Sequence, residues 1–202
     1  LVNIENVLGG FGNDRLIGDA GANVLDGAAG NDTLTGGAGD DTLLGGLGND
    51  VFIGGAGSDT LVGGEQRNVL WSAGLPADFD RLDYSGTGGI TANLSARTVT
   101  VAGEAGVDSY SGIEQIDGGF NQADVVTGRT TESTTVGDGA GINLFLRGGS
   151  DTVNITPYGV QQPGSDGATV LYNWSQTAIN VAFSSGNTAS FSYGASGTQL
   201  AG

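Results

Sequence analysis

Large apolar side chains recur every nine residues in the first third of the chain. From Gly9 onward the sequence divides into seven units: GGFGNDRLI, GDAGANVLD, GAAGNDTLT, GGAGDDTLL, GGLGNDVFI, GGAGSDTLV and GGEQRNVLW. The eighth position of every unit is a large apolar residue: Leu16, Leu25, Leu34, Leu43, Phe52, Leu61 and Leu70. Because successive side chains of a strand point to opposite faces, we expect a three-residue strand at positions seven to nine, with position eight facing inward.

The other six positions of each unit are rich in glycine and predict turns, since glycine adopts the positive-φ corners that other residues resist. Two units then make one coil, with turns on alternate sides, and stacked coils form two thin parallel sheets. The sequence therefore predicts an all-β fold in which residues 1–71 form a parallel β-roll, a kind of β-solenoid. A second β-rich region is expected over residues 72–202.

The sixth position of each unit carries an acid or its amide: Asp14, Asn23, Asp32, Asp41, Asp50, Asp59 and Asn68. If every second turn stacks, Asp14 lies above Asp32 and Asp50 on one side, and Asp41 lies above Asp59 on the other. Stacked carboxylates repel each other unless a cation neutralises them. Carboxylate and carbonyl oxygens suit Ca²⁺ better than Mg²⁺. Since the chain has no Cys and no His, zinc and copper are poor candidates.

The whole chain is strongly acidic, with 22 acids against 6 basic residues and a net charge of −16 over 202 residues. Nucleic acid is a poor partner, because phosphate binding needs Lys and Arg. No apolar run is long enough to span a membrane, so we expect no membrane insertion. The chain begins at Leu1 rather than Met, which suggests a piece of a longer protein.

The nine-residue units resemble the RTX (repeats-in-toxin, haemolysin-type) calcium-binding nonapeptide, GGxGxDxUx. The resemblance covers residues 9–71. It implies a Ca²⁺ ion between each turn and the second turn after it. The carbonyls at positions two and four and the acid come from the first turn, and the carbonyls at positions one and three and the acid from the later turn. About three to five calcium ions would occupy the roll.

Carried over to this sequence, the pattern gives three complete sites and two weaker ones. The complete sites consist of Gly10, Gly12, Asp14, Gly27, Ala29 and Asp32; of Ala28, Gly30, Asp32, Gly45, Leu47 and Asp50; and of Gly37, Gly39, Asp41, Gly54, Ala56 and Asp59. The weaker sites, each with one asparagine in place of a carboxylate, consist of Asp19, Gly21, Asn23, Gly36, Ala38 and Asp41; and of Gly46, Gly48, Asp50, Gly63, Glu65 and Asn68. The last turn also has Gln66 in place of the glycine at position four.

Calcium binding should be coupled to folding of the roll. One apolar residue per unit makes a thin core, and the backbone entropy lost on ordering some sixty residues opposes folding. Binding free energy then becomes folding free energy. We expect residues 9–71 to be disordered in chelator and ordered at millimolar calcium.

Beyond residues 72–77, a predicted connector, the nonapeptide period is lost. Short alternating runs predict further strands separated by Gly, Ser and Asn: GITANL, TVTV, TVNI, ATVLYNW and INVAF. The segment IENVLGGFGND at 4–14 is repeated as IEQIDGGFNQAD at 113–124, with one residue inserted before the acid. The second half thus resembles degenerate RTX repeats, and we expect either a continued, wider solenoid or a small β-sandwich docked on the roll.

Asp124, Asp138 and Asp151 follow glycine-rich segments of this second half and are candidate calcium ligands. The alternative is that they only cap turns.

The outward positions of the roll change character along the chain. Early units carry Arg15, Asp26, Thr33 and Thr35, whereas later units carry Leu44, Val51, Ile53, Val62, Val69 and Trp71. An apolar row of this kind predicts cover by the C-terminal region or by another chain. The alternative is ordinary β-propensity on a solvent-exposed face.

Catalysis is not expected. Without His, Cys or Lys, the chain lacks the side chains of the common nucleophile–base pairs. Carboxylates such as Glu104, Glu114 and Glu132 could serve glycoside chemistry, but their spacing selects no pair.

The sequence therefore favours a calcium-dependent structural or adhesive module of a secreted, cell-surface or extracellular-matrix bacterial protein, which binds extracellular Ca²⁺ and can assemble with copies of itself or with a surface polymer. The alternative is the C-terminal folding and export module of a type I-secreted enzyme, such as a protease, lipase or epimerase. Carbohydrate or protein binding by the aromatic second half is compatible with either.

Overall fold

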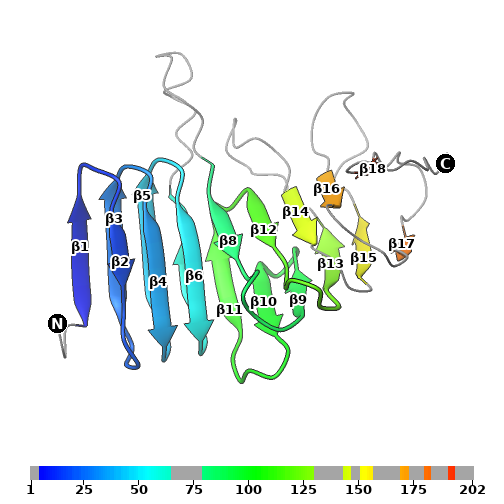
Figure 1. The fold of residues 1–202 in the computed structure, drawn as a ribbon, viewed down its shortest axis with the longest axis horizontal. Helices are drawn as coiled ribbons and strands as arrows, with labels where there is room; N and C mark the ends of the chain where they lie inside the picture. Colours follow the sequence, from blue (N-terminus) through cyan, green and yellow to red (C-terminus); the bar gives the residue numbers. More distant parts are fainter. Residues whose placement is uncertain are drawn as a thin grey trace, which may run out of the picture.

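The computed structural model describes residues 5–64, 79–129, 143–146, 151–156, 169–172, 180–182 and 191–193. These residues form strands and connecting turns, with no helix among them, and the strands stack along one long axis (Figure 1). Consequently no described helix is long and apolar enough to cross a membrane. The predicted all-β solenoid is confirmed.

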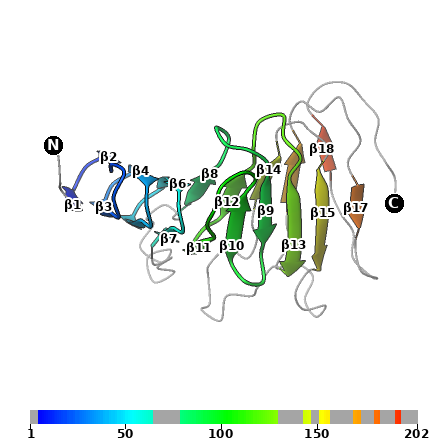
Figure 2. The same ribbon diagram turned by 90° about the horizontal axis from the view of Figure 1, so that it is seen from below.

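The strands belong to two sheets that face each other, as the view from below shows (Figure 2). The larger sheet has the order β1 (Asn6–Gly10), β3 (Val24–Ala29), β5 (Thr42–Leu47), β7 (Thr60–Val62), β11 (Asp108–Ser111), β10 (Thr98–Val101), β9 (Ile90–Asn93), β13 (Val125–Arg129), β15 (Thr152–Thr156) and β17 (Asn180–Ala182). The smaller sheet has the order β2 (Arg15–Ile17), β4 (Thr33–Ala38), β6 (Val51–Ala56), β8 (Arg81–Asp83), β12 (Gln115–Asp117), β14 (Asn143–Leu146), β16 (Thr169–Tyr172) and β18 (Phe191–Tyr193).

Consecutive strands of the roll alternate between the two sheets, so each strand pairs in parallel with the strand two units later. Leu25 lies opposite Leu43 in the larger sheet, and Leu34 lies opposite Phe52 in the smaller one. Both pairs are separated by two nonapeptides. The predicted arrangement of two units per coil is confirmed.

Most strands of the roll are longer than the three residues expected, whereas β2 and β7 have three. β3 to β6 each have six residues, because the first three positions of the next unit continue the strand. Gly37 lies opposite Gly55 and Ala38 opposite Ala56 in the same parallel ladder as the apolar positions. The glycines at positions one and two therefore belong to strand ends, and the turn proper is short.

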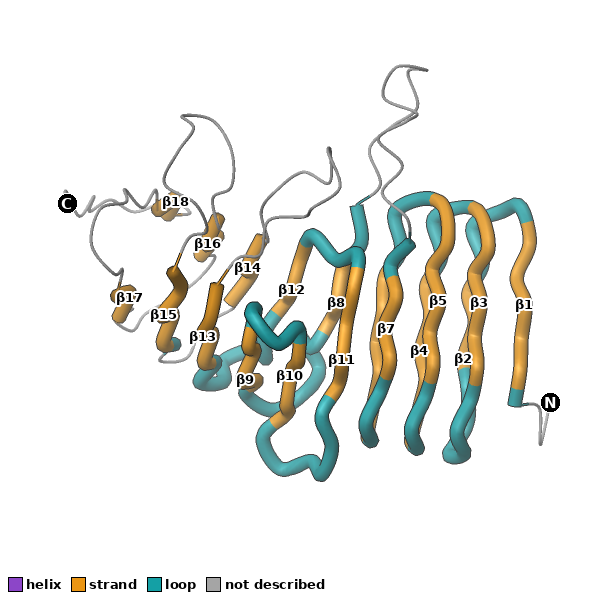
Figure 3. Tube along the Cα trace, turned by 180° about the vertical axis from the view of Figure 1, so that it is seen from behind, coloured by secondary structure: helices purple, strands orange, loops and turns teal. Residues whose placement is uncertain are grey.

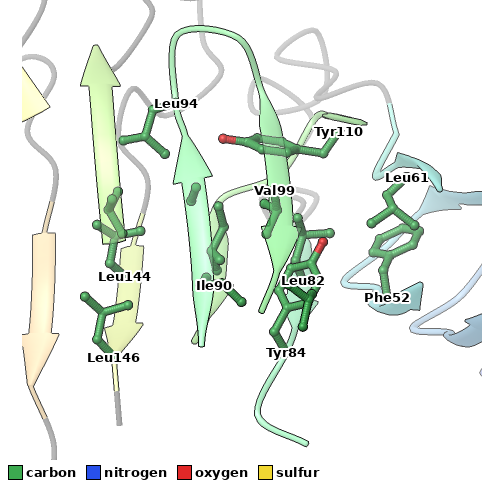
Figure 4. Packing of buried hydrophobic residues seen from close by; sticks show 14 of the residues in the cluster. Phe52, Leu61, Leu82, Tyr84, Ile90, Leu94, Val99, Tyr110, Leu144 and Leu146 are labelled. Carbon is green, nitrogen blue, oxygen red and sulfur yellow. The ribbon is translucent and has the colours of Figure 1, made fainter. Parts of the chain in front are cut away.

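The eighth-position side chains form a single-file core between the sheets. Leu25, Leu34 and Leu43 are fully buried, and Phe52 and Leu61 follow them. Beyond the roll the core widens: thirteen of the eighteen buried apolar residues lie between Leu82 and Val153. Figure 4 shows this wider part, with Tyr84, Ile90 and Val99 packed between the strands.

The second half continues the two sheets instead of docking a separate sandwich on the roll. Among its described strands, β9 and β10 form a hairpin in which they pair antiparallel, and β10 also pairs antiparallel with β11 (Figure 3). The predicted strands of the second half are confirmed as β9, β10, β15, β16 and β17. The predicted connector and the boundary at residue 71 lie within residues 65–78, outside the described residues.

The strand expected at residues 69–71 is not the partner of β6. That partner is β8, with Val51 opposite Arg81 and Phe52 opposite Leu82. Leu82, rather than Leu70, thus occupies the next place in the apolar column. Residues 69–71 themselves lie outside the described residues.

The outward apolar row is half-buried at Leu44, Val51, Ile53 and Val62. The described strands of the second half extend the roll along its axis and do not fold back over this row (Figure 1). Cover of this row by the C-terminal region or by another chain stays a prediction. Val69 and Trp71 lie outside the described residues.

Candidate metal sites

Each sixth-position acid directly precedes a strand and folds back over the start of its own turn. A Cβ atom added at Gly27, Gly36 or Gly54 would lie 2.3 Å from the carboxylate Oδ2 of Asp32, Asp41 or Asp59, respectively. Position one must therefore be glycine, because any side chain would displace the acid.

The acids stack in two ladders that join turns two units apart. On one side the amides of Asp14 and Asp32 donate to Oδ1 of Asp32 and Asp50, at 2.7 Å in both cases. On the other side Asn23 donates to Asp41 at 2.7 Å, and Asp41 donates to Asp59 at 2.9 Å. The predicted stacking of Asp14, Asp32 and Asp50, and of Asp41 and Asp59, is confirmed.

The second oxygen of these stacked carboxylates is buried without a hydrogen-bond donor. Asp32, Asp41 and Asp59 are at most 2% exposed, and their Oδ2 atoms have no partner. Burial raises the pKa of all three carboxyl groups above the ordinary value. A buried carboxylate oxygen that nothing satisfies destabilises the fold, so these atoms fit a bound cation.

Backbone carbonyl oxygens line the space between stacked turns. Four of these oxygens approach the glycine of the turn two units later so closely that a Cβ atom built there would lie within 2.3 Å of them. They are the carbonyl oxygens of Gly12, Asp19, Ala28 and Gly30. Those of Gly21 and Gly39 occupy the same place in the other turns. These are the carbonyls of positions two and four, as the calcium pattern requires.

Carbonyls of the later turn face back toward the earlier one. The first-position carbonyls of Gly27, Gly36, Gly45 and Gly54 approach the first glycine of the earlier turn. The third-position carbonyls of Leu47 and Ala56 accept amide hydrogen bonds at 2.8 Å from Gly30 and Gly39. Since a carbonyl oxygen has two lone pairs, one remains for a metal at each of these two oxygens.

The other predicted ligands lie in the same register. Ala29 pairs with Leu47 and Ala38 with Ala56, whereas Gly10 pairs with Ala28, Ala28 with Gly46, and Gly37 with Gly55. Gly48 stacks on the carbonyl of Gly30. The structure therefore brings the predicted residues of the first four sites together, two turns at a time.

This donor set consists only of oxygens and depends on the backbone. Among the described residues, no three His, Cys, Asp or Glu side chains come close enough to hold a metal by themselves. Two acids plus several carbonyls from two turns are the kind of set that Ca²⁺ accepts, with its six to eight flexible oxygen ligands.

A comparison with protein families decides the nature of the repeats. The model of the RTX calcium-binding nonapeptide repeat (4 copies) matches residues 8–43 and 35–70. Residues 8–70 are RTX calcium-binding nonapeptide repeats. No curated protein matches the chain significantly. The RTX repeats support calcium binding by this part of the chain.

The fifth predicted site of the RTX roll needs a correction. Asn68 and Glu65 lie outside the described residues, and the acid that follows Asp50 in the ladder is Asp80. The Asp50 amide donates to Asp80 Oδ1 at 2.8 Å, and a Cβ atom on Gly63 would lie 2.3 Å from Asp80 Oδ2. Gly63 and Asp80 thus make one turn with an insertion between them, and a carboxylate replaces the expected asparagine.

A degenerate unit of the second half was missed by the sequence analysis. Residues 103–111, GEAGVDSYS, keep glycine at positions one and four, the acid at position six and an apolar ring at position eight. The Asp59 amide donates to Asp108 Oδ1 at 3.0 Å, and Tyr110 lies opposite Leu61 in the sheet. The spacing of Gly103, Gly106, Asp108 and Tyr110 was the available signal.

The ladders also continue through longer and shorter turns. Asp80 donates its amide to Glu114 Oε2 at 2.8 Å, so glutamate closes a turn that begins at Gly112. Asp124 donates to Asp151 Oδ1 at 2.8 Å, and Ile90 donates to Asp124 Oδ1 at 2.9 Å. This turn reaches its acid two residues after Gly112, whereas a regular unit reaches it five residues after its first glycine. The longer side chain of Glu114 still lets its carboxylate accept the Asp80 amide.

The repeated segment noted in the sequence occupies equivalent places in the structure. A Cβ atom on Gly118 would lie 2.1 Å from Asp124 Oδ2, as one on Gly9 would lie 2.7 Å from Asp14 Oδ2. Asp124 Oδ2 is buried without a partner, and burial raises the pKa of Asp124 to about 6. Asp124 and Asp151 stay candidate ligands, whereas Asp138 lies outside the described residues.

Proposed function

We propose that this chain is a calcium-dependent structural or adhesive module of a bacterial cell-surface or extracellular-matrix protein. The observation that carries the proposal is the pair of acid ladders with buried, unsatisfied carboxylate oxygens at Asp32, Asp41 and Asp59. Such a roll is unfavourable without cations and closes when the chain meets extracellular calcium. Catalysis is not part of the proposed role, since the chain carries no His, Cys or Lys.

The outward apolar row of the roll supports self-association. Leu44 and Val62 lie opposite each other in neighbouring strands of the larger sheet, at outward positions, and are half-buried in the single chain. An apolar row on the outer face of a sheet is a surface that a second copy of the chain can cover.

Sedimentation velocity of the full chain tests both parts of this proposal. In chelator we expect an expanded monomer with a high frictional ratio. In millimolar calcium we expect a compact particle that forms larger species as concentration rises, and the double variant Leu44→Lys, Val62→Lys should keep the compaction and lose the larger species. A strict monomer at high concentration in calcium would exclude the assembly role.

A folding and export module of a type I-secreted enzyme would use the same calcium-coupled folding. The two roles differ in what the parent gene encodes beside this segment. A catalytic domain encoded upstream would favour the export role, whereas further repeats and surface-attachment domains would favour the structural one.

A further inference from the structure

Asp108 differs from the other stacked acids in how its second oxygen is satisfied. The Oδ2 atoms of Asp41 and Asp59, the two preceding acids of the same ladder, are buried without a donor. Asp108 is 3% exposed, yet its Oδ2 accepts a hydrogen bond of 2.8 Å from the Tyr84 hydroxyl. The Tyr84 hydroxyl thus contacts the carboxylate oxygen that, in the earlier turns, has no donor and is available to a cation.

Only the later part of the turn that carries Asp108 stacks on the preceding turn, 54–59. Gly106 lies against the carbonyl of Gly57, as the fourth-position glycines of the roll do. A Cβ atom on Gly103, however, would meet nothing within 4 Å, and residues 103–105 are exposed. The first-position carbonyl, which the calcium pattern needs, is not among the atoms closest to Gly54, unlike the first-position carbonyls of the roll.

Tyr84 is fixed by its surroundings. It directly follows β8, is 3% exposed, and packs in the wider core beside Leu82 (Figure 4). Burial, and then the charge of Asp108, raise the pKa of Tyr84 well above its ordinary value, so the hydroxyl keeps its proton at neutral pH. Burial also raises the pKa of Asp108 to about 6, and the hydrogen bonds from the Asp59 amide and from Tyr84 oppose that rise.

We propose that the Tyr84 hydroxyl takes the place of a cation at Asp108, so that this ladder binds its last calcium at Asp59. The junction between the RTX roll and the second half then closes without metal. Hydrogen bonds to a buried carboxylate stabilise its ionised form. In the earlier turns, a bound calcium ion would stabilise the ionised acids in the same way. This inference presupposes the calcium ladder of the proposed function.

Calcium stoichiometry of two matched variants tests the inference. Asp59→Asn and Asp108→Asn remove the same charge at consecutive positions of one ladder, and the amide keeps an oxygen for the ladder hydrogen bond. Equilibrium dialysis of the full chain, at a calcium concentration that just saturates the unsubstituted chain, should show about one bound ion fewer per chain for Asp59→Asn, because a site with asparagine binds calcium more weakly. Asp108→Asn should bind as many ions as the unsubstituted chain.

The possible results separate the two proposals. If Asp59→Asn binds the full number of ions, the calcium ladder itself is wrong. If Asp59→Asn and Asp108→Asn each lose an ion, Asp108 is a calcium ligand and the role of Tyr84 as a substitute is overturned.

A second measurement tests the hydrogen bond against simple packing. In calcium, Tyr84→Phe should increase the unfolding equilibrium constant by about tenfold or more, because Asp108 Oδ2 loses its donor. Asp108→Asn in the same chain should reverse most of that loss. If Tyr84→Phe costs the same with Asp108 and with Asn at that position, the phenol only fills space and the inference fails.

Discussion

The acids of the roll do not contribute equally, because an interior acid meets two neighbouring turns. Asp32 accepts the amide of Asp14 and donates its own amide to Asp50, so it belongs to two of the predicted sites. Asp14 is the first acid of its ladder and belongs to one site. The position of an acid in the ladder therefore sets how much calcium binding depends on it.

Asp32→Asn should accordingly raise the calcium concentration for half-folding by at least about tenfold, a loss of about 1.4 kcal/mol or more. Asp14→Asn, the matched control, should raise it less. Circular dichroism during calcium titration measures both midpoints. Equal midpoints for the two variants would contradict the stacked register.

Ala28 occupies a second position where most units of the roll have glycine, and its φ of 73° is in the left-handed region. For a residue with a Cβ atom, that conformation is unfavourable by about 1–2 kcal/mol. Ala28→Gly should therefore stabilise the calcium-loaded chain by about 1 kcal/mol in urea unfolding. The neighbouring control Ala29→Gly should destabilise it by about 0.5–1 kcal/mol, since glycine there adds only unfolded-state entropy. Stabilisation by both changes would refute the strain at Ala28.

Without calcium, the second half should become less stable as pH rises. Burial raises the pKa of Asp124 from 3.8 to about 6 in the folded chain. A raised folded-state pKa gives stability that is present below pH 3.8 and is lost as pH rises through about 6. Urea unfolding in chelator, followed by tyrosine near-UV circular dichroism, should show this loss, and Asp124→Asn should reduce it. Stability that rises between pH 4 and 7 would contradict the folded-state pKa value.

At the scale of elements, each strand from β3 to β7 contributes one buried apolar side chain to the core. Each is held mainly by its two neighbours in the sheet. Leu34 in β4 is fully buried, whereas Ile17, at the third position of the neighbouring strand β2, is 58% exposed. The roll thus has little apolar packing to lose at any one strand, and that little is concentrated at position eight.

Leu34→Ala should destabilise the calcium-loaded roll by about 3 kcal/mol, because it leaves a cavity in a single-file core. Ile17→Ala should change stability by less than about 1 kcal/mol. Urea unfolding in saturating calcium compares the two, and a similar small loss for both would show that the core contributes little.

The sequence predicted the elements where its period was intact. The nine-residue spacing placed the apolar column from Leu25 to Leu61 and the acid ladders, since both follow from two units per coil. It could not place Asp80, because residues 65–78 separate that acid from its glycine, Gly63. Nor could it give the antiparallel hairpin of β9 and β10, whose position between β11 and β13 depends on pairing between distant segments. The three-residue strand length is confirmed for β2 and β7 and was wrong for β3 to β6, because glycine positions also pair between coils there.

At the scale of the molecule, the same two sheets continue from the roll into the second half, but the apolar core between them is narrow in the roll and wider in the second half. The roll has five buried apolar residues and the second half has thirteen, among the residues described. The whole chain has a net charge of −16. Because its carboxylates stack in the roll, the roll is the half in which cations must replace apolar packing. The aromatic residues Tyr84 and Tyr110 lie in the wider core and are not available for carbohydrate binding, whereas Phe79 and Phe120 are exposed.

The central claim is that cations hold neighbouring turns of the roll together. Amide hydrogen exchange of residues 9–64 in millimolar calcium and in excess chelator tests it most directly. We predict strong protection of the β3 to β6 amides in calcium, and exchange at the rate of an unfolded chain in chelator. Equal protection of these amides in both conditions would show that the roll remains folded without metal and would contradict the account.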